Sequence, residues 1–270
     1  MVLSVGGMKM SVSYVSSNKT QIYRCEKKIR VNVNEKKIQL KAEDIEKKNK
    51  FWKMSLEKNN KLFNGKVLSV NNIKWLEDTI FLELYYTDYA HLNYIMNHSI
   101  NEMSPCRSVA AGALLITKDK FAIVGKMGKG TSFPGVIQCI GGGLSERDVE
   151  SDIEEATLKT AIRECYEEIG LELYNRLEGV RNKYVYIRED MSTFGVVYII
   201  NLELNKKQIF ENFANCKDKI EYEIEKIIAV RCDKTSIKKF CEDNLLVDYL
   251  NAVLYDYIGL CDLAYFGNEV

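Results

Sequence analysis

The sequence lacks several features that would assign it to a specialised class of protein. Only two histidines and two prolines occur among its 270 residues, and its eight cysteines form no C-x-x-C pair. A zinc site or a cysteine–histidine nucleophile needs closely spaced partners of these types, so both are poorly supported. The cysteines are scattered, several of them within apolar segments, which is typical of small core residues.

The chain also lacks an excess of either charge and any long apolar run. Its 38 basic and 38 acidic side chains give a formal net charge of zero, whereas a general nucleic-acid binder normally carries a basic excess. Residues 1–7 are apolar but too short for a secretory signal and without its basic leader, and no apolar run is long enough to span a bilayer. We therefore expect a cytoplasmic protein that does not insert into membranes and does not bind nucleic acid.

The most informative feature that is present is the acidic motif that follows Arg163. At 3.6 residues per turn, Glu164, Glu167 and Glu168 fall on one face of a helix. An isolated E-x-x-E-E pattern is usually a solvated face, but the arginine before it and Gly170 after it favour a binding site. Three carboxylates held together repel one another unless a cation neutralises them, and oxygen ligands suit Mg²⁺. The motif therefore predicts a magnesium site.

This segment resembles the second half of the Nudix box, G-x5-E-x7-R-E-U-x-E-E-x-G-U, in which U is a bulky apolar residue. Every fixed position from Arg163 to Leu171 matches, with Cys165 at the first U, and seven residues separate Glu155 from the arginine. Eleven residues separate Gly143 from Glu155 where the family pattern has five. The resemblance implies an α+β fold, the Nudix α/β/α sandwich with a mixed sheet, and a pyrophosphohydrolase activity.

The resemblance also implies roles for individual residues. The three glutamates of the motif would hold Mg²⁺, for which Mn²⁺ can substitute, with a carbonyl oxygen of Gly143 or its neighbour as a further ligand. Arg163 would orient the carboxylates. A separate carboxylate, Glu155 or Glu221, would take the proton from the attacking water, and Glu223 is the second candidate in the region of Glu221.

The role of Glu155 depends on where the box helix begins. A capping box over residues 151–154 favours an early start, which would place Glu155 nearly opposite Glu164 and out of reach of the metal. A later start would leave Glu155 in the preceding loop, from which it could fold back. Glu146 and Glu150 are its substitutes in the first case.

Residues 1–104 are expected to form a small α+β module in front of a catalytic domain that covers residues 105–270. Period-two and helical patterns predict strands at 8–15, 21–25, 29–33, 38–40, 66–70 and 79–85, and helices at 42–60 and 88–97. The stretch from residue 51 to 98 is similar to the N-terminal extension of Nudix hydrolases that cleave UDP-sugars. Trp52, an Asn-Gly turn and a cluster of tyrosines carry this similarity, which implies a nucleotide sugar among the substrates.

In the catalytic domain the apolar segments predict strands at 109–117, 121–126, 136–140, 171–174, 183–188, 193–204 and 227–230, with one or two closing helices within 235–260. The loop over residues 125–131 is rich in glycine and lysine. Gly130 stands where a Walker A loop needs Ser or Thr, so the loop is interpreted as a hairpin. Lys126 or Lys129 could still meet a substrate phosphate if the hairpin borders the pocket.

These features predict a metal-dependent hydrolase that cleaves the pyrophosphate bond of a nucleoside diphosphate linked to another group X. Its partner would be that small-molecule substrate, and a homodimer remains open. One alternative is a Nudix-fold nucleotide-binding or regulatory module without turnover. Adjacent carboxylates destabilise the fold when no cation is bound to them, and this favours the enzyme over the binding module. Another, an enzyme that processes nucleic-acid ends, would need a basic groove that the net charge does not indicate.

Overall fold

The computed structural model describes residues 20–60, 62–98, 103, 106–131, 133–149, 155–173, 180, 183–188, 193–216 and 223–263. The strands are β1 (Thr20–Cys25), β2 (Lys28–Lys37), β3 (Lys66–Trp75), β4 (Thr79–Asp88), β5 (Ser108–Ile116), β6 (Phe121–Met127), β7 (Ile137–Gln138), β8 (Ile140–Gly143), β9 (Lys183–Arg188), β10 (Thr193–Asn201) and β11 (Ile224–Arg231). The helices are α1 (Ala42–Lys58), α2 (Tyr89–Asn97), α3 (Glu146–Val149), α4 (Ala156–Ile169), α5 (Lys206–Asn215), α6 (Lys234–Asp243) and α7 (Leu250–Tyr257).

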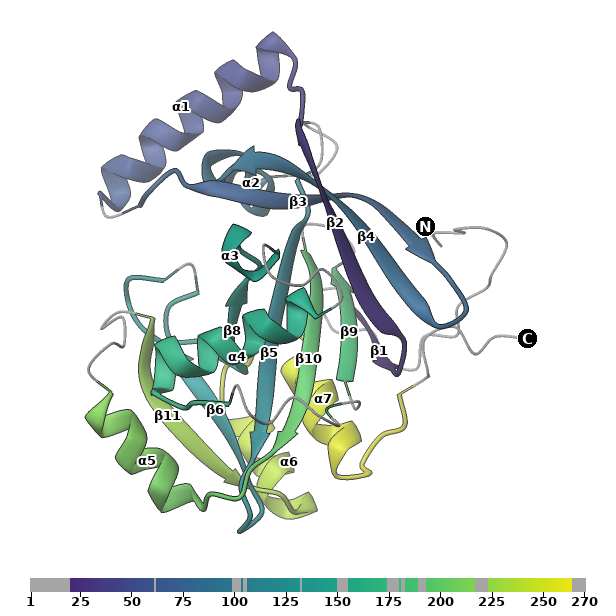
Figure 1. The fold of residues 1–270 in the computed structure, drawn as a ribbon. Coiled ribbons are helices and arrows are strands. Elements are labelled where there is room, and N and C mark those ends of the chain that lie inside the picture. The colour runs from purple at the N-terminus through teal and green to yellow at the C-terminus, as the bar shows by residue number, and fades with distance from the viewer. Residues whose placement is uncertain are drawn as a thin grey trace.

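These strands form one open sheet that runs through the molecule (Figure 1). Its main path has the order β1-β9-β10-β5-β3-β4-β2, while β8 pairs with β5, and β11, β6 and β7 continue from the other end of β5. β10 pairs in parallel with β5, and β2 with β4, whereas the other pairings between these strands are antiparallel. The predicted α+β fold with a mixed sheet is therefore confirmed.

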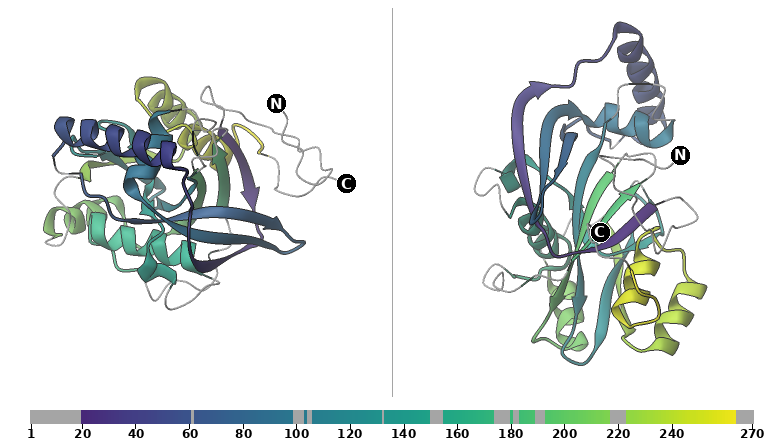
Figure 2. Two further views of the ribbon diagram at one scale, coloured as in Figure 1. Left: turned by 90° about the horizontal axis from the view of Figure 1, so that it is seen from above. Right: turned by 90° about the vertical axis from the view of Figure 1, so that its right-hand side faces the viewer.

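Alternating side chains of the central strands supply a core on each face of the sheet. On β5, Ala111, Ala113 and Leu115 belong to the core that contains the buried face of α4. Leu114 and Ile116, between and beyond them, belong to the core under α6 and α7. Figure 1 and the right view of Figure 2 show α4 and α5 on one side of the sheet and α6 and α7 on the other. The helices thus form a layer on each face.

The described residues between 20 and 98 contribute four strands to this sheet. β1 pairs with β9, and β3 meets β5 through the pair Ser69 and Ser108. The guanidinium of Arg24 on β1 donates two hydrogen bonds of 2.8 Å to Asp256 on α7. Strands β2, β3 and β4, which we call the front sheet, share one core with α4. The division predicted near residue 104 falls between α2 and β5 and stays a prediction.

Three predicted strands differ from the structure. Residues 38–40 leave the sheet after the N–H of Ile38 donates to the carbonyl oxygen of Tyr86, and the chain then enters α1. Residues 171–173 are not a strand, and their apolar side chains are buried by packing without sheet pairing. The segment 136–140 is interrupted at Cys139, so that β7 pairs with β6 and β8 with β5.

Helix α5 was not predicted, although its start carries a clear signal. The side chain of Asn205 accepts from the N–H of Gln208, and the Gln208 side chain accepts from the N–H of Asn205, which is a complete capping box. The predicted strand at residues 8–15 and the predicted capping box at 151–154 lie outside the described residues. None of the helices in the described part of the chain is long and apolar enough to cross a membrane.

Candidate metal centre

Helix α4 carries the acidic motif and is fixed by its apolar face. Ala161, Ile162 and Cys165 on this face are buried in the core shared with β5 and β10. The helix ends at Gly170, whose φ of 68° is left-handed and whose N–H donates to the carbonyl oxygen of Tyr166 at 2.9 Å. A glycine adopts this left-handed conformation at no steric cost. The packing of the apolar face and the helix end at Gly170 together determine which side chains of α4 face β8.

Three carboxylates converge beside α4. One oxygen of each of Glu164, Glu168 and Glu223 lies within 4.8 Å of the others. The first two are one turn apart on α4 and only 7% and 5% exposed, while Glu223 is half-buried directly before β11. Within the described residues, this is the one group of three or more histidine, cysteine or acidic side chains that is arranged to hold a metal ion.

The glycines of strand β8 lie against this group. The N–H of Gly141 donates to Glu168 Oε2 at 3.0 Å. A Cβ atom on Gly142 would stand 2.5 Å from Glu164 Oε1, so the carboxylate reaches the strand only because no side chain is there. The pairing of β8 with β5 holds these glycines in this place.

Arg163 connects the cluster to its surroundings. Its Nη1 lies 2.7 Å from Glu164 Oε1 and 2.7 Å from Glu167 Oε2. Its Nε and Nη2 donate to the two oxygens of Asp148 at 3.0 and 3.1 Å, and Nη2 also donates to the carbonyl oxygen of Gly143 at 3.2 Å. One guanidinium therefore fixes two carboxylates of α4 and a carbonyl of β8 at once.

Asp148, on α3, is the site residue that sequence reasoning missed. Its side chain is 3% exposed and accepts hydrogen bonds from both the N–H and the hydroxyl of Ser145. Burial alone would raise the pKa of Asp148, but the hydrogen bonds from Arg163 and Ser145 outweigh it and lower the pKa below its ordinary value. The Ser-x-x-Asp spacing from residue 145 was the signal, since it has the same form as a capping box.

Burial raises the pKa of each converging carboxylate, and the charges of neighbouring carboxylates add to the rise. Burial raises the pKa of Glu164 to about 7 against the opposing effect of Arg163, and the charge of Glu223 adds to the rise. Burial, then the charges of Glu164 and Glu223, raise the pKa of Glu168 well above its ordinary value. Burial and the charge of Glu167 likewise raise the pKa of Glu223. Three oxygen donors that resist ionisation in the absence of a cation fit a hard divalent ion such as Mg²⁺ or Mn²⁺.

The other predicted site residues lie around this cluster or outside the described residues. Glu167 is 28% exposed and pairs with Arg163 rather than converging with the three carboxylates. Glu155 is exposed directly before α4 and is not in the cluster. Its charge adds to the rise that burial causes in the pKa of Tyr198. The helix starts after Glu155, closer to the later of the two starts considered. Glu221 lies outside the described residues.

The glycine- and lysine-rich loop borders the cluster. The N–H of Gly128 donates to the carbonyl oxygen of Glu223 at 2.9 Å. β11 is irregular between Ile224 and Lys226, where it pairs with β6, and such irregularities turn a side chain out of the regular alternation. Lys126 on β6 lies 3.4 Å from Glu225 of β11. The hairpin therefore lies next to Glu223 of the cluster.

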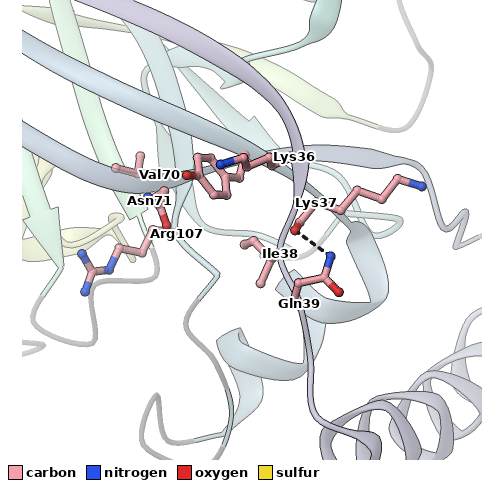
Figure 3. A pocket seen from close by; sticks show the side chains of 8 residues that line it. Lys36, Lys37, Ile38, Gln39, Val70, Asn71 and Arg107 are labelled. Atoms are coloured by element: carbon pink, nitrogen blue, oxygen red, sulfur yellow. Dashed lines mark hydrogen bonds between the residues drawn. The ribbon is translucent and has the colours of Figure 1, made fainter.

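A cavity of about 560 Å³ lies elsewhere, between the end of β2, the front sheet and the start of β5 (Figure 3). Its lining residues are Lys36, Lys37, Ile38, Gln39, Val70, Asn71, Tyr85 and Arg107. None of them belongs to the carboxylate cluster. The charged ends of Lys37 and Arg107 point away from each other in Figure 3, so this cavity does not gather its cations around one ligand position.

No protein-family model matches the sequence, and no curated protein matches it. The solved structures that resemble part of this chain include the following examples. A bifunctional NMN adenylyltransferase/ADP-ribose pyrophosphatase from Francisella tularensis, complexed with AMP and a manganese ion, is 15% identical with a TM-score of 0.41. That likeness covers 64% of this chain but only 48% of the other protein, about half of its length.

The other two similar structures are smaller. A protein from Deinococcus radiodurans is 13% identical with a TM-score of 0.37, over 57% of this chain and 83% of that one. A MutT protein from Methanosarcina mazei is 11% identical with a TM-score of 0.36, over 58% of this chain and 96% of that one. At these levels of similarity the function has to be inferred from the residues of this chain.

Proposed function

We propose that this protein is a metal-dependent hydrolase of the Nudix type that cleaves the pyrophosphate bond of a nucleoside diphosphate linked to another group X. The observation that carries the proposal is the convergence of Glu164, Glu168 and Glu223 within 4.8 Å. Buried carboxylates cost stability when they are ionised and unpaired, so a purely structural role gives little reason for three of them at one point.

In this proposal the three converging carboxylates hold Mg²⁺, which Mn²⁺ can replace. Glu167 lies beside them toward solvent, 28% exposed, and completes the acidic surface that faces the substrate. The carbonyl oxygen of Gly143 accepts from Arg163 at 3.2 Å, so it can serve as a ligand only in addition to that bond. Arg163 keeps Glu164 and Glu167 in place.

The chemistry follows from the charge of the diphosphate. A bound divalent ion would cancel part of the phosphate charge and would lower the pKa of a water molecule bound to it. The carboxylates of α4 and Glu223 would hold this ion at a fixed place on the chain, and a further carboxylate would take the proton from the attacking water. Glu221 is the preferred base because one residue separates it from Glu223, whereas Glu155 is exposed nine residues before Glu164.

The lysines of the hairpin are proposed to contact the substrate phosphates. Gly128 is hydrogen bonded to Glu223, and Lys129, the next residue, is exposed on the same loop. Lys126 already lies 3.4 Å from Glu225, so Lys129 is the freer of the two cations. The products would be a nucleoside monophosphate and a phosphorylated X group, with nucleotide sugars among the substrates.

The test is turnover of a substrate panel by the full-length protein. UDP-glucose, ADP-ribose, dinucleoside polyphosphates and nucleoside triphosphates are incubated with Mg²⁺, and the products are identified by phosphorus NMR. We expect cleavage of at least one diphosphate, lost on chelation of the metal. Glu168→Gln and Glu223→Gln should each lower the rate by about a hundredfold or more, because each removes an ionised ligand.

Glu211→Gln is the matched control. Glu211 is an exposed glutamate on α5 whose partner is Lys207, and its substitution should leave the rate unchanged. Full activity of both cluster variants would contradict the proposed role of the carboxylates. Tight binding of one nucleotide without any turnover would instead favour the nucleotide-binding module.

A further inference from the structure

The loop between β8 and α4 supplies a partner for Arg163 that the sequence did not predict. The Nudix pattern puts a glutamate before the arginine with seven residues between them, and that glutamate is here Glu155. That residue is exposed and outside the carboxylate cluster. The side chain that grips Arg163 is Asp148, through two hydrogen bonds of 3.0 and 3.1 Å, and it is 3% exposed.

Asp148 is itself held from two sides. Within the loop, the N–H and hydroxyl of Ser145 donate to its Oδ2 at 2.9 and 2.8 Å. On the other side, α3 rests against the front sheet, between that sheet and α4 (Figure 1). Lys66 of β3 lies 3.1 Å from Glu146 of α3, and the phenol of Tyr86 on β4 is also hydrogen bonded to Glu146. Two elements of the first hundred residues thus anchor the segment that carries Asp148.

The guanidinium of Arg163 also contacts two glutamates of α4, through the nitrogen that Asp148 does not bind. Nη1 of Arg163 is 2.7 Å from both Glu164 and Glu167, while Nε and Nη2 are engaged by Asp148. A guanidinium without Asp148 would be free to turn both of its edges toward the glutamates and to compete with a metal ion for them. Asp148 therefore determines how many of the glutamate oxygens near Arg163 remain available to bind a cation.

We propose that Asp148 is the positioning residue of this metal centre, and that the front sheet holds it in place through Glu146. The proposal rests on the proposed function only in taking the carboxylate cluster as a divalent-cation site. It gives the first hundred residues a role at the metal centre without any contact to the metal. Partners of this kind, one step removed from the ligands, typically change metal affinity by 10- to 100-fold when they are lost.

The first experiment measures Mn²⁺ affinity, with the full-length protein, from the electron paramagnetic resonance signal of free Mn²⁺. Asp148→Asn keeps an acceptor for the N–H of Ser145 but loses the charge that holds Arg163. We expect its Mn²⁺ dissociation constant to rise at least tenfold. Asp262→Asn is the control, because it removes an aspartate that pairs with Arg24 at 2.8 Å and is 88% exposed, and it should bind Mn²⁺ like the wild type.

The second experiment asks whether Asp148 acts through Arg163. In an Arg163→Gln background, Asp148→Asn should change the dissociation constant by less than about twofold, because the connection is already broken. A loss that depends only on a looser fold would appear equally in both backgrounds. If Asp148→Asn does not fold, Glu146→Gln takes its place. Glu146 is 40% exposed, so this variant should fold and bind Mn²⁺ about threefold more weakly.

The outcomes separate this inference from the proposed function. A wild type that binds no Mn²⁺ contradicts both. A wild type that binds Mn²⁺, with a folded Asp148→Asn variant of unchanged affinity, overturns the role of Asp148 alone. A loss of affinity in Glu155→Gln without one in Asp148→Asn would assign the positioning role to Glu155 instead of Asp148.

Discussion

The metal-free protein should lose stability as the pH rises from 5 to 8. Burial raises the pKa of Glu164 from 4.5 to about 7 in the folded state, whereas in the unfolded chain the carboxyl ionises near its ordinary value. Between these two pH values the folded state binds more protons than the unfolded state, so the free energy of unfolding falls as the pH rises. The effect is complete above the folded-state pKa.

The size of this effect follows from the shift of Glu164 alone. A rise from 4.5 to about 7 in a side chain that is only 7% exposed corresponds to about 3 kcal/mol of lost stability. Glu168 and Glu223, whose pKa values are also raised, act in the same direction. A divalent ion at a free concentration of 100 times its dissociation constant adds about 2.7 kcal/mol to the free energy of unfolding. Added metal should therefore stabilise the protein much more at pH 8 than at pH 5.

The assay is urea unfolding at pH 5 and pH 8, in EDTA and in excess Mg²⁺. Other shifted carboxyls do not interfere, because the pKa values of Asp88 and Asp148 are lowered and these groups stay ionised across this range. Glu164→Gln should flatten the dependence on pH in EDTA, while Glu211→Gln should not. Equal stability of the EDTA-treated wild type at pH 5 and pH 8 would refute the reasoning, since it would show that the cluster carries no electrostatic cost.

Three further substitutions test other parts of the structure. Gly142→Ala places a Cβ atom 2.5 Å from Glu164 Oε1, at the movable end of a side chain, so we expect about tenfold weaker Mn²⁺ binding and an unchanged thermal midpoint. Asp256→Ala removes the acceptor of Arg24, Tyr184 and the N–H of Leu263 and should cost about 3 kcal/mol in urea unfolding. Asn205→Ala removes the cap of α5 and should cost about 1 kcal/mol in the same assay. A loss of stability in the first variant, or none in the other two, would count against these assignments.

The parts of the site that the sequence predicts are the local ones. The spacing of the glutamates and the left-handed Gly170 depend on contacts within one helix, so the periodicity of residues 163–170 is enough to place them. Glu164 and Glu168 accordingly converge as expected. The mixed sheet, by contrast, was implied by the resemblance to the Nudix box, because apolar segments such as β5 do not reveal whether their neighbours pair in parallel.

The parts that the sequence does not predict depend on tertiary contacts. Glu223 approaches α4 only because β11 pairs with β6 at the edge of the sheet, and alternate glutamates before a strand look the same on a solvated edge. Asp148 reaches Arg163 from α3, within the lengthened loop before α4, and the fixed spacing of a motif cannot reveal such a contact. The strand expected after Gly170 fails because burial, rather than pairing, explains its apolar residues.

The most direct test of the central claim is anomalous diffraction from crystals soaked in MnCl₂. The structure predicts a manganese peak within about 2.5 Å of carboxylate oxygens of Glu164, Glu168 and Glu223. Well-ordered density for these three side chains without a peak between them, or with a peak only at an unrelated surface site, would contradict the account.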